Sequence, residues 1–141
     1  EAMPLLRFRS RDHVQVTMGE TGTGRTGPRI RCVGRTDDML IVRGVNLFPT
    51  AIRSVLDQFN GAVSGLFLVQ PSQHGVKQEP PLPVAVEVAP GATPDNPDLQ
   101  ARIRHAIKER LLVTAEVQLV GNNTLPRETY KSKLVDYSKA S

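Results

Sequence analysis

The chain has 141 residues, of which 39% are hydrophobic and 23% are charged, and its formal net charge is +4. This length fits one domain, or one domain with an appendage. No run of about 18 apolar residues occurs, which excludes a membrane-spanning helix as an interpretation of the sequence. The single cysteine, Cys32, excludes an internal disulfide and fits a reducing, cytoplasmic location. The positive excess is small enough to be a solvated surface.

The first 36 residues predict strands and a glycine-rich loop. Apolar and polar residues alternate in 5–9 and again in 13–18, which predicts a hairpin with its turn near 10–12. Residues 19–28 contain four glycines and must form a loop. This loop lacks the Gly-Lys-Ser/Thr ending and the following helix of a phosphate-binding loop. A strand pattern begins almost at the first residue, so we expect a piece of a longer chain.

From Met39 onward the pattern predicts a compact α+β domain. A short strand at 39–43 precedes a helix that starts at Pro49, a residue favoured in the first helical turn. The remaining elements are an apolar helical stripe at Ile52, Val55, Leu56 and Phe59, strands at 64–70, 82–90 and 115–120, and a second stripe at Leu99, Ile103, Ile107 and Leu111. This order is βαββαβ, the ferredoxin-like layout. After Val120 we expect a loop and a short terminal helix.

The corner GRTDD, residues 34–38, joins the hairpin region to this domain. Adjacent aspartates at a joint can accept hydrogen bonds and tolerate several backbone conformations, which makes Asp37 a candidate pivot. Aspartate pairs are also common in plain turns, and the residues alone leave both interpretations open. Three other residues also have an interpretation without a functional role. Asp12 fits a turn acid, Arg35 fits an ion-pair partner, and Lys131 fits a solvated terminal lysine.

Residues 34–52, GRTDDMLIVRGVNLFPTAI, closely resemble the hinge segment of adenylate-forming acyl-CoA ligases, in particular the phenylacetate-CoA ligase group. Upstream, LLRFRSRD resembles the family strand R-Y-R-T-x-D. Downstream, LPRETYKSK resembles the family motif L-P-R-x-x-G-K. The family loop C-x-C-G-R-T is matched by GTGRTGPR without its cysteines. The resemblance covers nearly the whole chain and places it at the C-terminal end of the family.

The resemblance implies a role for five residues. Asp12 matches the aspartate that holds the ribose hydroxyls of ATP, and Arg35 matches an arginine that contacts the same ribose. Asp37 matches the hinge residue, and Gly44 matches a glycine near the path of the pantetheine arm of CoA. Lys131 matches the lysine that acts in adenylation.

One departure concerns the residue before that lysine. The family usually has glycine there, whereas this chain has Tyr130, which restricts the backbone that glycine leaves free. Lys133 therefore stays an alternative to Lys131 as the catalytic lysine.

The resemblance also implies cofactors and partners. Residues 1–36 would be a remnant of a large N-terminal adenylation domain, and residues 37–141 the mobile C-terminal domain. The substrates would be ATP, CoA and an aryl carboxylic acid from aromatic catabolism, with Mg²⁺ bound mainly by the N-terminal domain. We expect the fragment alone to be inactive, and its hairpin to be mobile or to form a homodimer.

Two alternatives come from other classes of protein. A stand-alone ferredoxin-like ligand-binding or regulatory module has the same layout. RNA-recognition domains share it as well, but they stack bases on aromatic residues of the central strands. The predicted strand LPVAVEVAP has no aromatic residue, so we expect no nucleic-acid partner.

Overall fold

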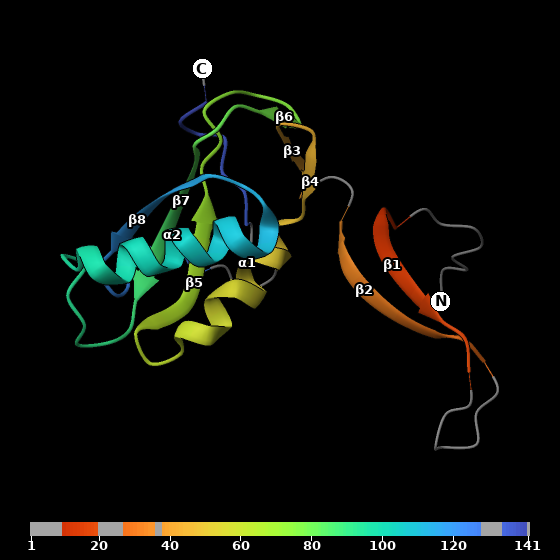
Figure 1. The fold of residues 1–141 in the computed structure, drawn as a ribbon, viewed down its shortest axis with the longest axis horizontal. Coiled ribbons are helices and arrows are strands. Elements are labelled where there is room, and N and C mark those ends of the chain that lie inside the picture. The colour runs from red at the N-terminus through yellow and green to blue at the C-terminus, as the bar shows by residue number, and fades with distance from the viewer. Residues whose placement is uncertain (1–9, 20–26, 36–37, 128–133, 141) are drawn as a thin grey trace, which may run out of the picture.

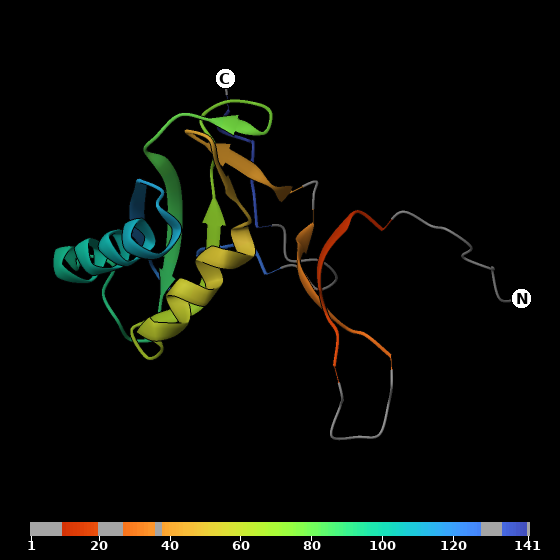
Figure 2. The same cartoon turned by 45° about the vertical axis from the view of Figure 1, so that its right-hand side comes forward.

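The structure is a computed structural model that describes residues 10–19, 27–35, 38–127 and 134–140. Figure 1 shows a long two-stranded hairpin, β1–β2, beside a compact body in which two helices lie on one face of a sheet. Figure 2 shows the same two parts from a second direction, with the hairpin again on one side of the helical body. No helix in the described ranges is long and apolar enough to cross a membrane.

The hairpin consists of β1 (Asp12–Thr17) and β2 (Arg29–Arg35), which pair antiparallel. Val14 lies opposite Cys32 and Val16 lies opposite Ile30, so these side chains share one face of the ribbon. All of β1 is exposed, and most of β2 is exposed as well. The hairpin therefore contributes almost nothing to the core of the body.

A second, tighter hairpin follows, formed by β3 (Leu40–Val42) and β4 (Val45–Leu47). Its two turn residues, Arg43 and Gly44, both have positive φ, 49° and 81°. Two positive φ values define the type I′ turn, whose twist matches that of paired strands. The short strand β6 (Lys77–Gln78) adds to β3 in parallel.

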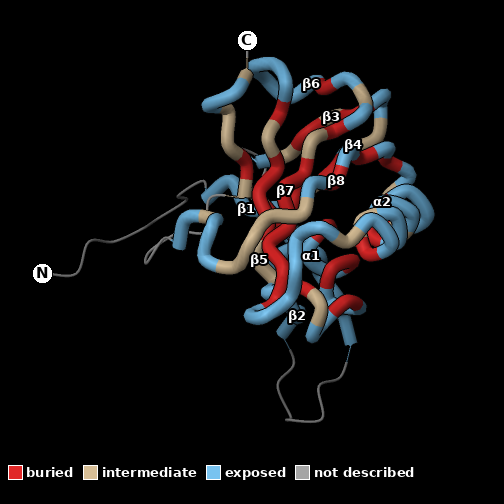
Figure 3. Tube along the Cα trace, turned by 90° about the vertical axis from the view of Figure 1, so that its left-hand side faces the viewer, coloured by how far each residue is buried: buried red, intermediate tan, exposed pale blue. Residues whose placement is uncertain are grey.

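The body is built from two helices and a three-stranded sheet. Its elements are α1 (Pro49–Leu56), a 3₁₀ turn at Asp57–Phe59, β5 (Val63–Val69), β7 (Leu82–Val88), α2 (Pro97–Leu111) and β8 (Ala115–Val120). The side-chain oxygen of Asn96 accepts a hydrogen bond from the Leu99 amide at 2.9 Å and caps α2. The buried residues of both helices pack with those of the strands in one core, which Figure 3 shows in red.

The α+β class is confirmed, and both predicted helices are present with their apolar stripes facing the core. The exact ferredoxin-like strand order is not confirmed. In the described strands the order is β5-β7-β8, with β7 and β8 parallel, and β3 belongs to a separate sheet with β4 and β6. The type I′ turn pairs β3 with β4 in a hairpin. In addition, β3 is short, with only three residues.

Near the ends of the chain the structure adds one strand to the prediction and corrects one predicted helix. The described partner of β1 is β2, a strand that the sequence analysis did not predict, while the predicted partner at 5–9 lies outside the described residues. The predicted terminal helix is wrong for 134–140, where Val135 instead forms a parallel bridge with Val69. Val135 is buried in the core, so burial of an apolar side chain fixes this segment in extended form.

Candidate functional site

Asp12 and Arg35, the two predicted ribose contacts, occupy directly opposed positions at one end of the β1–β2 hairpin. Asp12 is exposed and Arg35 is half-buried. Opposed residues of an antiparallel pair project from the same face with Cβ atoms about 5 Å apart. The fold therefore brings together an acceptor-only carboxylate and a guanidinium donor beside the junction that leads into β3.

The same junction carries contacts between the β1–β2 hairpin and the residues at the start of α1, on the two sides of the predicted hinge. The Thr50 hydroxyl donates a hydrogen bond to the Val33 carbonyl at 2.7 Å. The Phe48 ring lies 5.2 Å from the His13 ring, and a Cβ built on Gly34 would lie 2.9 Å from Phe48 Cδ1. A hollow of about 380 Å³ remains between β2 and the start of α1.

Gly44 lies in the turn between β3 and β4, at the far end of that hairpin from the junction with β2. It is exposed with φ +81°, and a Cβ built on it would meet nothing within 4 Å. The position thus offers backbone that a ligand can approach closely, and its conformation is one that favours glycine. The structure does not group Gly44 with Asp12 and Arg35.

Asp37, Tyr130, Lys131 and Lys133 lie outside the described residues. The segment before the lysines is described up to Arg127, and it contacts Glu87 in the central strand β7. The Glu87 side chain has no exposed surface, although it carries a carboxylate. Arg127 Nη2 donates to Glu87 Oε1 at 3.0 Å and forms an ion pair with it. Glu87 is not among the predicted site residues, and its signal in the sequence is a lone charge inside an apolar strand.

The C-terminal segment passes near the residue that follows Asp37. Burial raises the pKa of Tyr137 above its ordinary value, and the nearby Asp38 carboxylate raises it further. The Tyr137 hydroxyl donates to the Gly75 carbonyl at 3.3 Å, and its ring stacks on His74 at 5.7 Å. Residues 134–140 are thereby held against both the 71–76 loop and the start of the domain.

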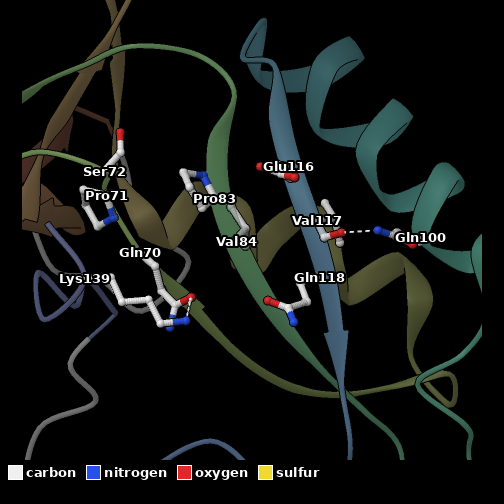
Figure 4. Close-up of a pocket in the computed structure, with 10 residues that line it drawn as sticks. All are labelled: Gln70, Pro71, Ser72, Pro83, Val84, Gln100, Glu116, Val117, Gln118 and Lys139. Atoms are coloured by element: carbon white, nitrogen blue, oxygen red, sulfur yellow. Dashed lines mark hydrogen bonds between the residues drawn. The ribbon is translucent and has the colours of Figure 1, made fainter.

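A second hollow of about 400 Å³ lies beside β7 and β8. Figure 4 shows it lined mainly by amide, carboxylate and proline side chains, with Lys139 donating to Gln70 and Gln100 donating to the Val117 carbonyl. It contains none of the predicted site residues. Among the residues that the structure describes, no group of three or more His, Cys, Asp or Glu side chains could hold a metal ion.

Comparison with known proteins gives the class of this fold. The family of AMP-binding enzyme C-terminal domains matches residues 44–138, and the chain belongs to this family. The phenylacetate-coenzyme A ligase of Escherichia coli K12 is 30% identical over 136 residues, which are 94% of this chain and 30% of that protein. The chain therefore spans about a third of the length of this relative and corresponds to a C-terminal portion of such ligases.

Two solved structures resemble this chain. A domain of phenylacetate-coenzyme A ligase from Bacteroides vulgatus is 31% identical, with a TM-score of 0.57, covering 74% of this chain and 95% of that one. A 2-hydroxyisobutyryl-CoA ligase in the postadenylation state, in complex with 2-HIB-AMP, is 27% identical with a TM-score of 0.79, covering 92% of this chain and 28% of that one.

The same 2-hydroxyisobutyryl-CoA ligase was also solved with 2-HIB-AMP and CoA in the thioesterification state. There the TM-score is 0.60 at 28% identity, covering 91% of this chain and 27% of that one. Identity and coverage hardly differ between the two states, and the TM-score is higher for the postadenylation state.

Proposed function

We propose that the chain carries the C-terminal lid of an ATP-dependent aryl acid-CoA ligase, and that most of its larger N-terminal domain lies elsewhere in a longer protein. The observation that carries this proposal is the match of 92% of the chain, hairpin and body together, to an acyl-CoA ligase in its postadenylation state. Phenylacetate or a similar aryl acid is the proposed substrate, because the relatives matched over most of this chain carry the name phenylacetate-coenzyme A ligase.

In the first half-reaction, the acid carboxylate attacks the α-phosphate of ATP and displaces pyrophosphate. Both reactants are anionic, so the site needs a cation where negative charge develops. Lys131 supplies this charge in our proposal, as a compact ammonium on a long stem. Asp12 accepts hydrogen bonds from the ribose hydroxyls and Arg35 contacts the same ribose, which their opposed positions on β1 and β2 support.

In the second half-reaction, the CoA thiol attacks the acyl carbonyl of the adenylate, and AMP leaves. Lys131 has to withdraw to admit the pantetheine arm, so the lid rotates about Asp37. The rotation would break the contact between Thr50 and Val33, which spans the hinge. It would bring Gly44, in its open turn, toward the pantetheine path.

Mg²⁺ is the one implied group that the described residues do not fit, because they contain no suitable cluster of ligands. We assign it to the N-terminal domain of the longer protein and derive no step through it here. Under the same division, residues 1–36 belong with that domain and residues 37–141 form the mobile lid.

The proposal is tested with the longer protein and with this chain alone. The longer protein should release pyrophosphate from ATP when phenylacetate is added, and should form phenylacetyl-CoA when CoA follows. This chain alone should do neither, since a lid without its N-terminal domain has no acyl pocket. Steady pyrophosphate release by the isolated chain, or a longer protein inactive toward every aryl acid tried, would contradict the proposal.

A further inference from the structure

Glu87 is a buried carboxylate whose described hydrogen-bond partners all come from one segment, residues 122–127. Asn122 Nδ2 donates to Oε1 at 3.3 Å, and the Leu125 amide donates to Oε2 at 3.2 Å. Arg127 Nη2 donates to Oε1 at 3.0 Å. Asn122 Nδ2 also lies 3.2 Å from the Val88 carbonyl, so the contact extends to the β7 backbone.

The route of the chain explains this convergence. Glu87 pairs in register with Val120, the last residue of β8, so β8 ends directly beside the carboxylate. A turn follows, in which the Thr124 amide donates to the Gly121 carbonyl at 3.3 Å and Asn123 takes a positive φ of 63°. The turn returns the chain toward β7, where Asn122, Leu125 and Arg127 meet Glu87.

Packing of the core does not by itself explain why β7 carries a glutamate at position 87. Successive side chains of a strand project from opposite faces, so Glu87 projects away from the face that carries Val86 and Val88. Those two valines are buried and make the helix-covered face of β7 apolar. A buried carboxylate is costly unless hydrogen bonds and a counter-ion compensate it, and here the segment 122–127 provides both.

We propose that Glu87 is a positioning residue for adenylation, which fixes residues 122–127 and thereby sets where the chain enters the segment that bears Lys131. Only three residues separate Arg127 from Lys131 in the sequence. The inference rests on the proposed function, because it needs Lys131 to act in the first half-reaction. Glu87 acts through residues 122–127 and does not itself contact substrate.

The first test uses Glu87→Gln in the longer ligase, with both half-reactions measured separately. The amide keeps the shape of the side chain but replaces one acceptor by a donor, which opposes either the Leu125 amide or Arg127 and Asn122. Pyrophosphate formation should fall about 100-fold, as expected when a catalytic group is misplaced by about 1 Å. Thioester formation from pre-made acyl-adenylate and CoA should stay within about twofold of wild type, since Lys131 is not needed there.

Two variants accompany Glu87→Gln. Arg127→Gln removes the exposed partner of the ion pair, whose side chain is 55% exposed, and should fold even where a change at Glu87 does not. Arg127→Gln should lower pyrophosphate formation and spare thioester formation, as Glu87→Gln should. Glu116→Gln is the matched control, an exposed glutamate on β8, and should leave both half-reactions unchanged.

The second test uses this chain and does not depend on catalysis. Amide exchange at Leu125 should be slow in the wild type and at least about 10-fold faster in Glu87→Gln, because its acceptor is weakened. Equal Leu125 exchange in the two proteins would overturn the anchoring role.

The outcomes separate this inference from the proposed function. If Lys131→Ala abolishes adenylation but Glu87→Gln and Arg127→Gln do not affect it, the inference alone is overturned. A loss of both half-reactions in parallel with a lower Tm would show a merely structural role and would also overturn it. If neither Lys131→Ala nor Lys133→Ala affects adenylation, the proposed function fails, and the inference fails with it.

Discussion

Among the described residues, Tyr137 is the one whose environment shifts its pKa most clearly. Burial is the larger cause and the Asp38 carboxylate the smaller one, and both raise its pKa above the ordinary 10.0. The folded protein therefore holds the phenolic proton more tightly than the unfolded chain. The stabilisation is fully present below pH 10.0, the unfolded value, and is lost as the pH rises through the higher folded pKa.

This predicts a late tyrosine titration. The sequence has two tyrosines, Tyr130 and Tyr137, so the difference in phenolate absorbance between wild type and Tyr137→Phe isolates one of them. We expect its midpoint above 10.0, and a lower midpoint in Asp38→Asn because one repulsive charge is gone. A midpoint at or below the ordinary value would show that the C-terminal segment does not pack as described.

Gly34 is a second residue where local geometry leads to a prediction. It is buried against Phe48, and an added Cβ would lie 2.9, 3.2 and 3.3 Å from three atoms of that side chain. Because the contacts include Phe48 Cβ and not only the ring edge, the side chain cannot relieve the overlap by a small rotation.

We expect Gly34→Ala to lower the free energy of unfolding by about 1–3 kcal/mol, the usual cost of overpacking. Urea denaturation of this chain, followed by circular dichroism, measures the change. Gly27→Ala is the matched control, because a Cβ at Gly27 meets nothing within 4 Å and its φ is not in the positive range. Equal denaturation midpoints for the two variants would contradict the packing of β2 on Phe48, the residue before α1.

At the scale of elements, the helices were predictable and the pairing of the strands was not. The stripes of α1 and α2 repeat every three or four residues, and a local pattern of this kind is visible in the sequence. Pairing between β7 and β8 depends on contacts across a whole helix, and no local pattern encodes it. β2 was missed because the glycine-rich stretch before it hid the alternation of its arginines with Ile30 and Cys32.

The residues of the candidate site were likewise predictable only in part. Asp12 and Arg35 were predicted through motif resemblance, and their opposition across β1 and β2 follows only from the register of the hairpin. Glu87 could not be assigned a role from the sequence, because its partners lie about 40 residues further along the chain. The hinge and lysine assignments at Asp37 and Lys131 stay predictions.

For the whole molecule, the open question is what covers the apolar face of the β1–β2 hairpin. Val16 and Ile30 oppose each other across the ribbon and are 53% and 66% exposed. Paired apolar side chains on an exposed ribbon are typical of a surface that another body covers. In the proposed ligase that body is the N-terminal domain.

This predicts that Ile30→Asp destabilises the longer ligase strongly and this chain hardly at all. The change should lower the stability of the longer ligase by about 3–5 kcal/mol, because a charge becomes buried without a partner. In this chain the effect should stay within about 0.5 kcal/mol, as for other surface substitutions. Thermal and urea denaturation measure both, with Thr17→Asp, an exposed position on the other face, as control.

A strongly destabilised isolated chain, or an unaffected longer ligase, would show that the hairpin does not lie against the N-terminal domain.

The most direct test of the central claim compares Lys131→Ala and Lys133→Ala in the longer ligase. Pyrophosphate formation from ATP and acid is measured beside thioester formation from pre-made acyl-adenylate and CoA. We predict that Lys131→Ala slows the first reaction by about two to three orders of magnitude and spares the second, while Lys133→Ala spares both. Selective loss with Lys133→Ala would move the catalytic role to that lysine, and unchanged adenylation in both variants would contradict the assignment of this chain as an adenylating lid.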